Sequence, residues 1–351
     1  MSILHNSNAG WFISHAYLIN SFYKECATSN GVNNFRIKEG IFQIHSPFKT
    51  ASKSIKKRKR KLEIVENSDI IKDIGHVKNA YSDFKLEIQH LLSEPKEDFN
   101  KSALDLSSTI YAESGTASVT NLIGENKDDA KFLCINNSHF LFPINCRFYC
   151  KYVSELNVYL VDEKFDLILL DPPWWNKYIR RKKAKTDFGY QMMFNDDIKA
   201  LSINNLLKDD GVVVVWCTNS EQHIKALTID FFHKWGVKFA AKLYWVKITT
   251  SGDTICNFSD PPGKQPFEQI VIGVKHNSNK ALLNLNGKLV VSVPSALHSH
   301  KPPLIKILEP YLPENPHCLE LFARYLQPNW SSWGLEVLRF QHESLYEIID
   351  T

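Results

Sequence analysis

The sequence contains no long hydrophobic runs, no N-terminal pattern typical of a secretory leader and no glycine-rich phosphate loops. Its longest strictly apolar run, Val212 to Cys217, is far shorter than the ~20 residues needed to cross a bilayer. Asn, Ser and His interrupt the residues behind Met1, so no signal peptide is predicted. No GxGxxG or Walker motif is present, which argues against nucleotide phosphates as the ligand. We therefore expect a soluble intracellular protein without a membrane partner.

Paired cysteines are also missing. The seven cysteines are odd in number, scattered and without a CxxC pair. This pattern predicts reduced core thiols rather than a disulfide framework or a zinc site. Cys146 and Cys150 lie four residues apart but have no second ligand pair, and His298 and His300 are interpreted as loop histidines. No metal is expected.

Apolar material is abundant. Of 351 residues, 44% are hydrophobic and 12% aromatic, which excludes a disordered chain and predicts a packed core. Residues 1–48 are rich in aromatics and are predicted to pack on that core as an N-terminal segment. Residues 62–94 show helical spacing that ends before Pro95, within an accessory region over 62–130 that we expect to be partly helical.

Positive charge is concentrated in two short segments. Residues 49–61 carry eight Lys and Arg residues, and residues 177–185 carry six. Removing these fourteen charges from the net charge of +4 leaves the rest of the chain at −10. Such local fields attract polyanions, above all nucleic acid. We interpret 49–61 as a linker whose basic run, 53–61, is a nuclear localisation signal, with direct RNA contact as a compatible second role and a solvated loop as the alternative.

From about residue 130 onward, short apolar runs alternate with helical stretches. Strands are predicted at 165–170, 212–217, 239–248, 267–274, 289–293 and 317–322. Helices are predicted at 198–207, 221–235 and 301–312. This alternation predicts an α/β sheet covered by helices on both faces.

The tetrapeptide Asp171-Pro172-Pro173-Trp174 directly follows the predicted strand 165–170. Ligands of open α/β sheets bind at the carboxyl ends of strands, so this position suits a site. The prolines have no N–H groups and leave their carbonyls as acceptors, while the tryptophan offers a plane for stacking. Together they form a receptor for the exocyclic amino group of a flat base. The alternative for the tetrapeptide alone is a strand-ending turn with an Asp cap.

Further motifs in a fixed order make the sequence resemble the DPPW family of S-adenosylmethionine-dependent adenine-N6 methyltransferases. They are Gly211 to Cys217, Trp245 to Lys247, Pro266 to Glu268, Ser299 to Pro302, Glu320 to Arg324 and Gln327 to Trp330. Trp330 to Gly334 and Phe340 to His342 are most similar to the methyltransferase-like protein four branch. The resemblance implies a Rossmann-like α/β methyltransferase domain at 131–345, behind a mainly helical or irregular N-terminal region.

The resemblance also implies residue roles. Asp171 and the Pro172 carbonyl would accept the two N6 hydrogens, in a catalytic turn completed by Pro173 and by Trp174 against the adenine. The implied contacts of the cofactor, S-adenosylmethionine, are Val153, Asp171, Lys301, Glu320, Phe322, Arg324 and Asn329. The expected substrate contacts are Trp174, Trp175, Lys177, Arg180, Arg181, Lys182 and Lys183, the charged ones through phosphates.

The branch implies RNA as the substrate, specifically 2′-O-methyladenosine of spliceosomal U2 small nuclear RNA, and activity without an obligate partner subunit. DNA adenine is the alternative substrate, and an RNA-binding protein with weak catalysis is the alternative function. Three positions depart from the family pattern and weaken expected cofactor contacts: Tyr152, Gln265 and Leu335.

Overall fold

The computed structural model describes residues 2–48, 68–94, 97–116, 119–175, 192–261, 263–278 and 280–349. The predicted localisation signal at 53–61 and the basic segment Lys177 to Lys185 lie outside the described residues. Among the described helices, none is long and apolar enough to span a membrane.

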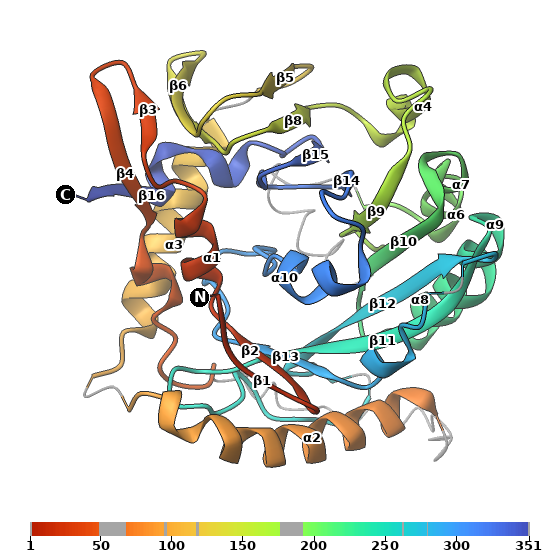
Figure 1. The fold of residues 1–351 in the computed structure, drawn as a ribbon. Helices are drawn as coiled ribbons and strands as arrows, with labels where there is room; N and C mark the ends of the chain where they lie inside the picture. The colour runs from red at the N-terminus through yellow and green to blue at the C-terminus, as the bar shows by residue number, and fades with distance from the viewer. Residues whose placement is uncertain are drawn as a thin grey trace.

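A large twisted sheet forms the centre of the molecule (Figure 1). In spatial order its eleven strands are β1 (Ile3–Ser7), β2 (Gly10–Ile13), β13 (Leu289–Ser292), β11 (Val237–Lys247), β12 (Phe267–Lys275), β10 (Leu207–Cys217), β9 (Phe165–Leu170), β14 (Cys318–Leu321), β15 (Trp330–Trp333), β8 (Cys146–Tyr149) and β5 (Ile123–Asn126). Strands β10, β9, β14, β15 and β8 are mutually parallel, and β12 is antiparallel to both of its neighbours.

The chain leaves the two central strands in opposite directions. From β9 it continues to β10 on one side, whereas from β14 it continues to β15 on the other. Such a reversal of strand order opens a crevice at the carboxyl ends of the two strands. The turn beginning at Asp171 lies at this crevice.

Both faces of the sheet are buried at β9, β12 and the second half of β10, which is why these strands are largely continuous apolar runs. One face packs under α4 (Leu156–Tyr159), α6 (Asn195–Lys199), α7 (Ile203–Leu206), the π-helical turn Ala226–Phe231 and α9 (Phe232–Lys234), preceded by α8 (Glu221–Lys225). The other face packs against α10 (Ile305–Leu308) and the 3₁₀ turn Leu283–Leu285. The predicted doubly covered α/β sheet is confirmed.

Helix α2 (Asp69–Ile88) lies across the β11–β13 end of the sheet (Figure 1). Its buried stripe includes Val77, Tyr81, Phe84 and Ile88, at the three- and four-residue spacing that predicted a helix. A 3₁₀ turn, Gln89–Leu91, ends it before Pro95. The predicted helix at 62–94 is therefore confirmed over its described part.

The N-terminal region contains more strand than the sequence predicted. A second sheet has the order β16 (Tyr346–Ile349), β4 (Gly31–Ile37), β3 (Cys26–Thr28), β6 (Lys131–Ile135) and β7 (Ser138–Phe142). Residues 1–48 thus contribute strands to both sheets, together with α1 (His15–Ser21) and the 3₁₀ turn Glu39–Phe42. Helices α1, α2 and α3 (Asn100–Thr116) agree with the expected mainly helical or irregular region, and the strands of residues 1–48 are an addition to it.

The predicted domain boundary at residue 130 does not separate two parts of the structure, because β5 pairs with β8 and β3 pairs with β6. The predicted helix at 198–207 is two short helices, α6 and α7, separated at Ala200 to Ser202. The predicted helix at 301–312 is reduced to α10 and the 3₁₀ turn Glu309–Tyr311. All seven cysteines are free, as expected, although Cys134 is exposed rather than in the core.

Candidate active site

Asp171 lies at the first position beyond β9, where the crevice between β9 and β14 opens. Its backbone N–H donates to the Leu321 carbonyl at 3.3 Å, which extends the β9–β14 ladder by one residue. The carboxylate therefore projects from a backbone that the neighbouring strand fixes. This confirms the expected position of the tetrapeptide at the carboxyl end of a buried strand.

Backbone hydrogen bonds inside the turn already use its proline carbonyls. The Trp174 N–H donates to the Pro172 carbonyl at 2.8 Å, and the Met193 N–H donates to the Pro173 carbonyl at 2.9 Å. The Trp175 N–H donates to the Met193 carbonyl at 3.1 Å. A carbonyl oxygen has two lone pairs, so the Pro172 carbonyl keeps one acceptor position for a ligand.

Trp174 is a core residue. Its indole is 7% exposed, its Nε1 donates to the Trp216 carbonyl at 2.9 Å, and its ring lies 5.0 Å from His223 and 6.1 Å from Phe231. Such burial leaves an edge of the ring, not an open plane, to border a ligand. These contacts show that Trp174 anchors the turn in the core.

A chain of alternating charges passes through Asp171. The Lys301 Nζ lies 3.6 Å from one Asp171 carboxylate oxygen, and Arg324 lies 3.8 Å from the other. Lys301 also donates to Glu268, and the other Glu268 oxygen accepts from Lys247. The sequence motifs therefore meet as one network although they are far apart along the chain.

Beyond Arg324 the charge chain continues to a helix. Arg324 donates to Glu336 at 3.0 Å, and Glu336 accepts from Arg339 at 2.5 Å. The Arg339 guanidinium stacks on the Tyr111 ring of α3 at 3.6 Å. The charge chain, from Lys247 to Arg339, thus alternates four cations with three carboxylates.

Electrostatic pairing outweighs burial at the centre of the charge chain. Burial alone would raise the pKa of Glu268, but Lys247 and Lys301 hold it well below its ordinary value. Burial lowers the pKa of Lys247, whereas Asp171 and Glu268 outweigh burial at Lys301 and raise its pKa. Lys301 is thus fixed as a cation, and it also lies 5.2 Å from the centre of the Trp216 ring.

Glu320 behaves differently because burial outweighs the attraction of Arg324, the cation that lowers its pKa. It is 5% exposed, and burial is the main reason that its pKa is raised to about 8. Its carboxyl accepts from Gln327 Nε2 at 3.1 Å, and the negative charge of Asp171 raises the pKa further. At neutral pH this carboxyl is mostly protonated, so it can donate as well as accept.

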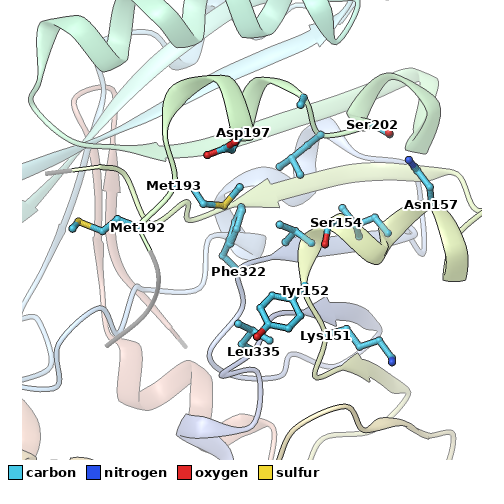
Figure 2. A pocket seen from close by; sticks show the side chains of 14 residues that line it. Lys151, Tyr152, Ser154, Asn157, Met192, Met193, Asp197, Ser202, Phe322 and Leu335 are labelled. Atoms are coloured by element: carbon cyan, nitrogen blue, oxygen red, sulfur yellow. The ribbon is translucent and has the colours of Figure 1, made fainter. Parts of the chain in front are cut away.

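A cavity of about 510 Å³ opens beside the turn (Figure 2). It is lined by residues between 151 and 157 after β8, residues between 192 and 202 around α6, and Phe322 and Leu335 after β14 and β15. The volume is within the usual range for small-molecule sites. Apolar walls from Val153, Phe322 and Leu335 alternate with polar groups such as Asp197, which suits a ligand with a flat ring and hydroxyl groups.

The structure brings most of the predicted site residues together. Lys301 and Arg324 are both in ionic contact with Asp171. Glu320 lies close enough to Asp171 for the charge of Asp171 to raise its pKa. Val153 and Phe322 line the cavity next to the turn. Trp175 follows the turn and is half-buried. Lys177, Arg180, Arg181, Lys182 and Lys183 lie outside the described residues.

Asn329 is not part of this group. It precedes β15, so the length of that strand separates it from the carboxyl edge at which Asp171 lies. It lines a different cavity, of about 860 Å³, and its side chain accepts from Asn145 at 3.2 Å. The predicted cofactor contact at Asn329 therefore does not fit the geometry, because the motif did not reveal at which end of the strand it lies.

Two residues of the charge chain had no catalytic or binding role predicted from the sequence. Glu268 and Lys247 appeared only as parts of matching motifs, yet they complete the charge chain at Lys301. The sequence did contain an indication of this role: a carboxylate and an ammonium group lie within predicted buried strands, where an unpaired charge costs free energy. The described residues contain no group of three or more potential ligands that could hold a metal ion.

The three departures from the family pattern have distinct surroundings. Tyr152 is 59% exposed and lines the cavity together with Leu335. Gln265 points into its own loop, where its Nε2 donates to the Ser259 and Gly263 carbonyls. Thus two of the three border the cavity and one is structural.

Comparison with known proteins gives a consistent result. Residues 165–336 match the MT-A70 family. The mouse protein named N(6)-adenine-specific methyltransferase METTL4 is 36% identical over 242 residues, which are 66% of this chain and 50% of the mouse protein. The chain thus spans about half the length of the mouse and human relatives.

Two further relatives carry other names. The Caenorhabditis elegans DNA N6-methyl methyltransferase is 28% identical over 346 residues, covering 89% of this chain and 93% of its own length. The Pyricularia oryzae N6-methyladenosine RNA methyltransferase MTA1 is 33% identical over 216 residues, 58% of this chain and 56% of the fungal protein. These matches confirm the expected resemblance, including its METTL4-like branch, and with the sheet order they confirm the Rossmann-like α/β fold.

Proposed function

Residues 165–336 match the MT-A70 family, and from this similarity we propose that the chain methylates the N6 amino group of adenine in nucleic acid, with S-adenosylmethionine as methyl donor. The observation that carries the proposal is the Asp171 carboxylate, held at the crevice between Lys301 and Arg324 and next to the cavity.

The role of Asp171 follows from how the amino group changes during the reaction. The N6 lone pair of adenine is delocalised into the ring, so the nitrogen would become tetrahedral and positive as it bonds to the methyl carbon, while the carbon–sulfur bond of the donor would break and its electron pair would stay on sulfur. The N6 hydrogens would then become stronger donors, and one of them would leave as a proton to solvent after the transfer. Acceptors already in place at Asp171 and the Pro172 carbonyl stabilise this state more than the ground state. Neither acceptor needs to move, since backbone hydrogen bonds fix both.

The residues around Asp171 fit the proposed cofactor. The cofactor supplies an electrophilic methyl group, and its adenosine part suits the cavity lined by Val153 and Phe322. The carboxylate of the cofactor would bind to Lys301 and Arg324, the two cations that flank Asp171. Glu320, protonated at neutral pH, is suited to bind a hydroxyl group or, when ionised, the ammonium group. Burial of Gln327 Oε1 without a partner in the described residues is consistent with a missing polar ligand group nearby.

We further propose RNA as the substrate class, and 2′-O-methyladenosine of U2 small nuclear RNA as the specific target, on the strength of the branch resemblance. The names of the relatives support both nucleic acids, because the nematode protein is named for DNA and the fungal protein for RNA. To test this, the protein is incubated with RNA and DNA oligonucleotides of one sequence, with and without 2′-O-methylation, and N6-methyladenine is measured by mass spectrometry. Preferential methylation of DNA would replace the RNA proposal.

The catalytic proposal is tested by Asp171→Asn, which keeps the shape of the side chain. We expect methyl transfer to fall at least a hundredfold, whereas cofactor affinity measured by calorimetry stays within a few-fold. The matched control is Asp162→Asn, an exposed position, which should behave like the wild type. Activity of the Asp171 variant within tenfold of wild type would rule out the role.

For localisation we propose the nucleus, with the basic run 53–61 as the signal and with the cytoplasm as a second compartment. Replacing Lys56, Lys57, Arg58, Lys59, Arg60 and Lys61 by alanine should move a fluorescently tagged protein into the cytoplasm. Unchanged nuclear fluorescence would leave nucleic-acid contact as the role of the run. We also propose that the chain acts without an obligate partner subunit, which purified protein alone can test.

A further inference from the structure

Two aromatic rings lie side by side next to the catalytic turn. The Trp175 and Phe194 ring centroids are 6.0 Å apart with planes inclined by 21°, so the rings are stacked with an offset. Phe194 is 60% exposed, although it lies beside a well-packed core. The exposed face of the Phe194 ring adds no stability to the fold, because it is not buried. That face is therefore available to a ligand.

The backbone on both sides of the pair is fixed. Trp175 donates its N–H to Met193 at 3.1 Å, and its carbonyl accepts from His223 Nε2 at 3.2 Å. His223 Nδ1 in turn lies 2.8 Å from the side chain of Asn195, the residue after Phe194. A single histidine thus joins the two segments that carry the rings.

Phe194 also begins a helix. Its N–H donates to the Asp197 carboxylate at 3.1 Å, and its carbonyl accepts from the Ile198 N–H at 3.2 Å, so the residue caps α6. Asp197 lines the cavity beside the turn. The position of the Phe194 ring is therefore coupled to the same elements that build the candidate active site.

We propose that Trp175 and Phe194 form a stacking platform for a nucleobase that neighbours the target adenine on the same strand. The proposal rests on the proposed function. Trp175 follows Asp171 by four positions, which limits their separation to about 14 Å, or roughly four stacked nucleotides. A base between the rings would need about 7 Å, twice the spacing of stacked bases, so the base stacks on the outer face of Phe194 instead.

A nucleobase explains these features better than a protein side chain does. The rings are offset and nearly parallel, which suits the flat face of a base, and stacking on aromatics tolerates any base.

The test measures binding of a labelled single-stranded oligonucleotide with one adenine, by fluorescence anisotropy, at fixed salt. A series of oligonucleotides carries one abasic site at each of the four positions on either side. For wild type we expect one abasic position to weaken binding about tenfold. Phe194→Leu should weaken binding of the intact oligonucleotide about tenfold and be insensitive to that abasic position, whereas Phe194→Tyr should behave like wild type.

Phe239→Leu is the matched control, since Phe239 is 45% exposed on β11 and outside the site. Equal affinity of wild type and Phe194→Leu, or an equal effect of every abasic position on both, would overturn the platform. Methyl transfer by wild type is measured in parallel. Its absence together with the abasic pattern would reject the proposed function alone, and its presence without that pattern would reject the platform alone.

Discussion

Replacing Glu268 by glutamine should destabilise the protein through the two lysines that it separates. Lys247 and Lys301 bind the same carboxylate, and the side chains of all three residues are at most 26% exposed. Without the carboxylate, two ammonium groups face each other on the order of 5 Å apart, which costs about 3 kcal/mol at an effective dielectric constant of ~20. Breaking a fully buried pair costs ~3–5 kcal/mol, so partial exposure places the expected loss at about 2–3 kcal/mol.

This loss can be measured by thermal unfolding. Unfolding entropy is ~2.1 cal/mol/K per residue, so for a chain of this length a loss of about 2–3 kcal/mol lowers Tm by roughly 3–4 °C. The control is Glu309→Gln, which removes an exposed partner of Lys306 and should lower Tm by less than ~1 °C. Adding Lys247→Met to Glu268→Gln removes one of the two ammonium groups and should restore at least half of the loss.

The pH dependence provides a second readout. The folded-state pKa of Glu268 lies below its unfolded value, so the stabilisation is fully present above about pH 4.5 and disappears as the pH falls through the folded pKa. The difference in unfolding free energy between wild type and Glu268→Gln should therefore shrink only in acid. A Tm loss no larger than that of the Glu309 control would refute the reasoning.

Three other predictions concern buried ionisable groups and the basic segment. Burial raises the pKa of Glu320 to about 8, so wild-type stability should fall as the pH rises from about 4.5 to about 8, and urea unfolding of Glu320→Gln should show no such fall. Burial lowers the pKa of His300 to about 4, so wild-type stability should fall as the pH decreases from about 6.5 to about 4, and His300→Phe should flatten that slope. Neutral replacement of Arg180 to Lys183 should reduce the log–log salt slope of RNA binding by about 3 without changing cofactor affinity, and an unchanged slope would show that the segment does not contact phosphates.

The parallel strands at the centre could be predicted because burial on both faces makes them continuous apolar runs. Strand β9 coincides with the predicted range 165–170, β12 is one residue longer than predicted, and β14 is one residue shorter than predicted at each end. The position of Asp171 followed from β9, since a polar residue directly after a buried strand lies at its carboxyl edge. The ion pairs of Lys301 and Arg324 could not be derived from spacing, and it was the family resemblance that put these residues in one site.

The rest depends on contacts that no local pattern encodes. Strand β1 is short and contains His, Asn and Ser, so it has no apolar alternation, and its neighbour β2 pairs with β13 nearly 280 residues away. Strand β15 was not predicted, because two serines interrupt its apolar residues. Without that strand, Asn329 seemed adjacent to the site, whereas the structure places it at the amino edge.

The N-terminal segment is structurally inseparable from the charge chain. His15 of α1 lies 2.8 Å from the Ser292 hydroxyl of β13, and the same hydroxyl accepts from Trp245 Nε1 at 2.8 Å. The Trp245 ring in turn lies 4.4 Å from the Lys247 ammonium and 5.9 Å from that of Lys301. Burial, with His300 and Lys247, holds the pKa of His15 well below its ordinary value, so a neutral imidazole supports this contact without adding positive charge. Residues 1–48 therefore help to position Lys301, one of the two cations that flank Asp171, although the family match begins only at residue 165.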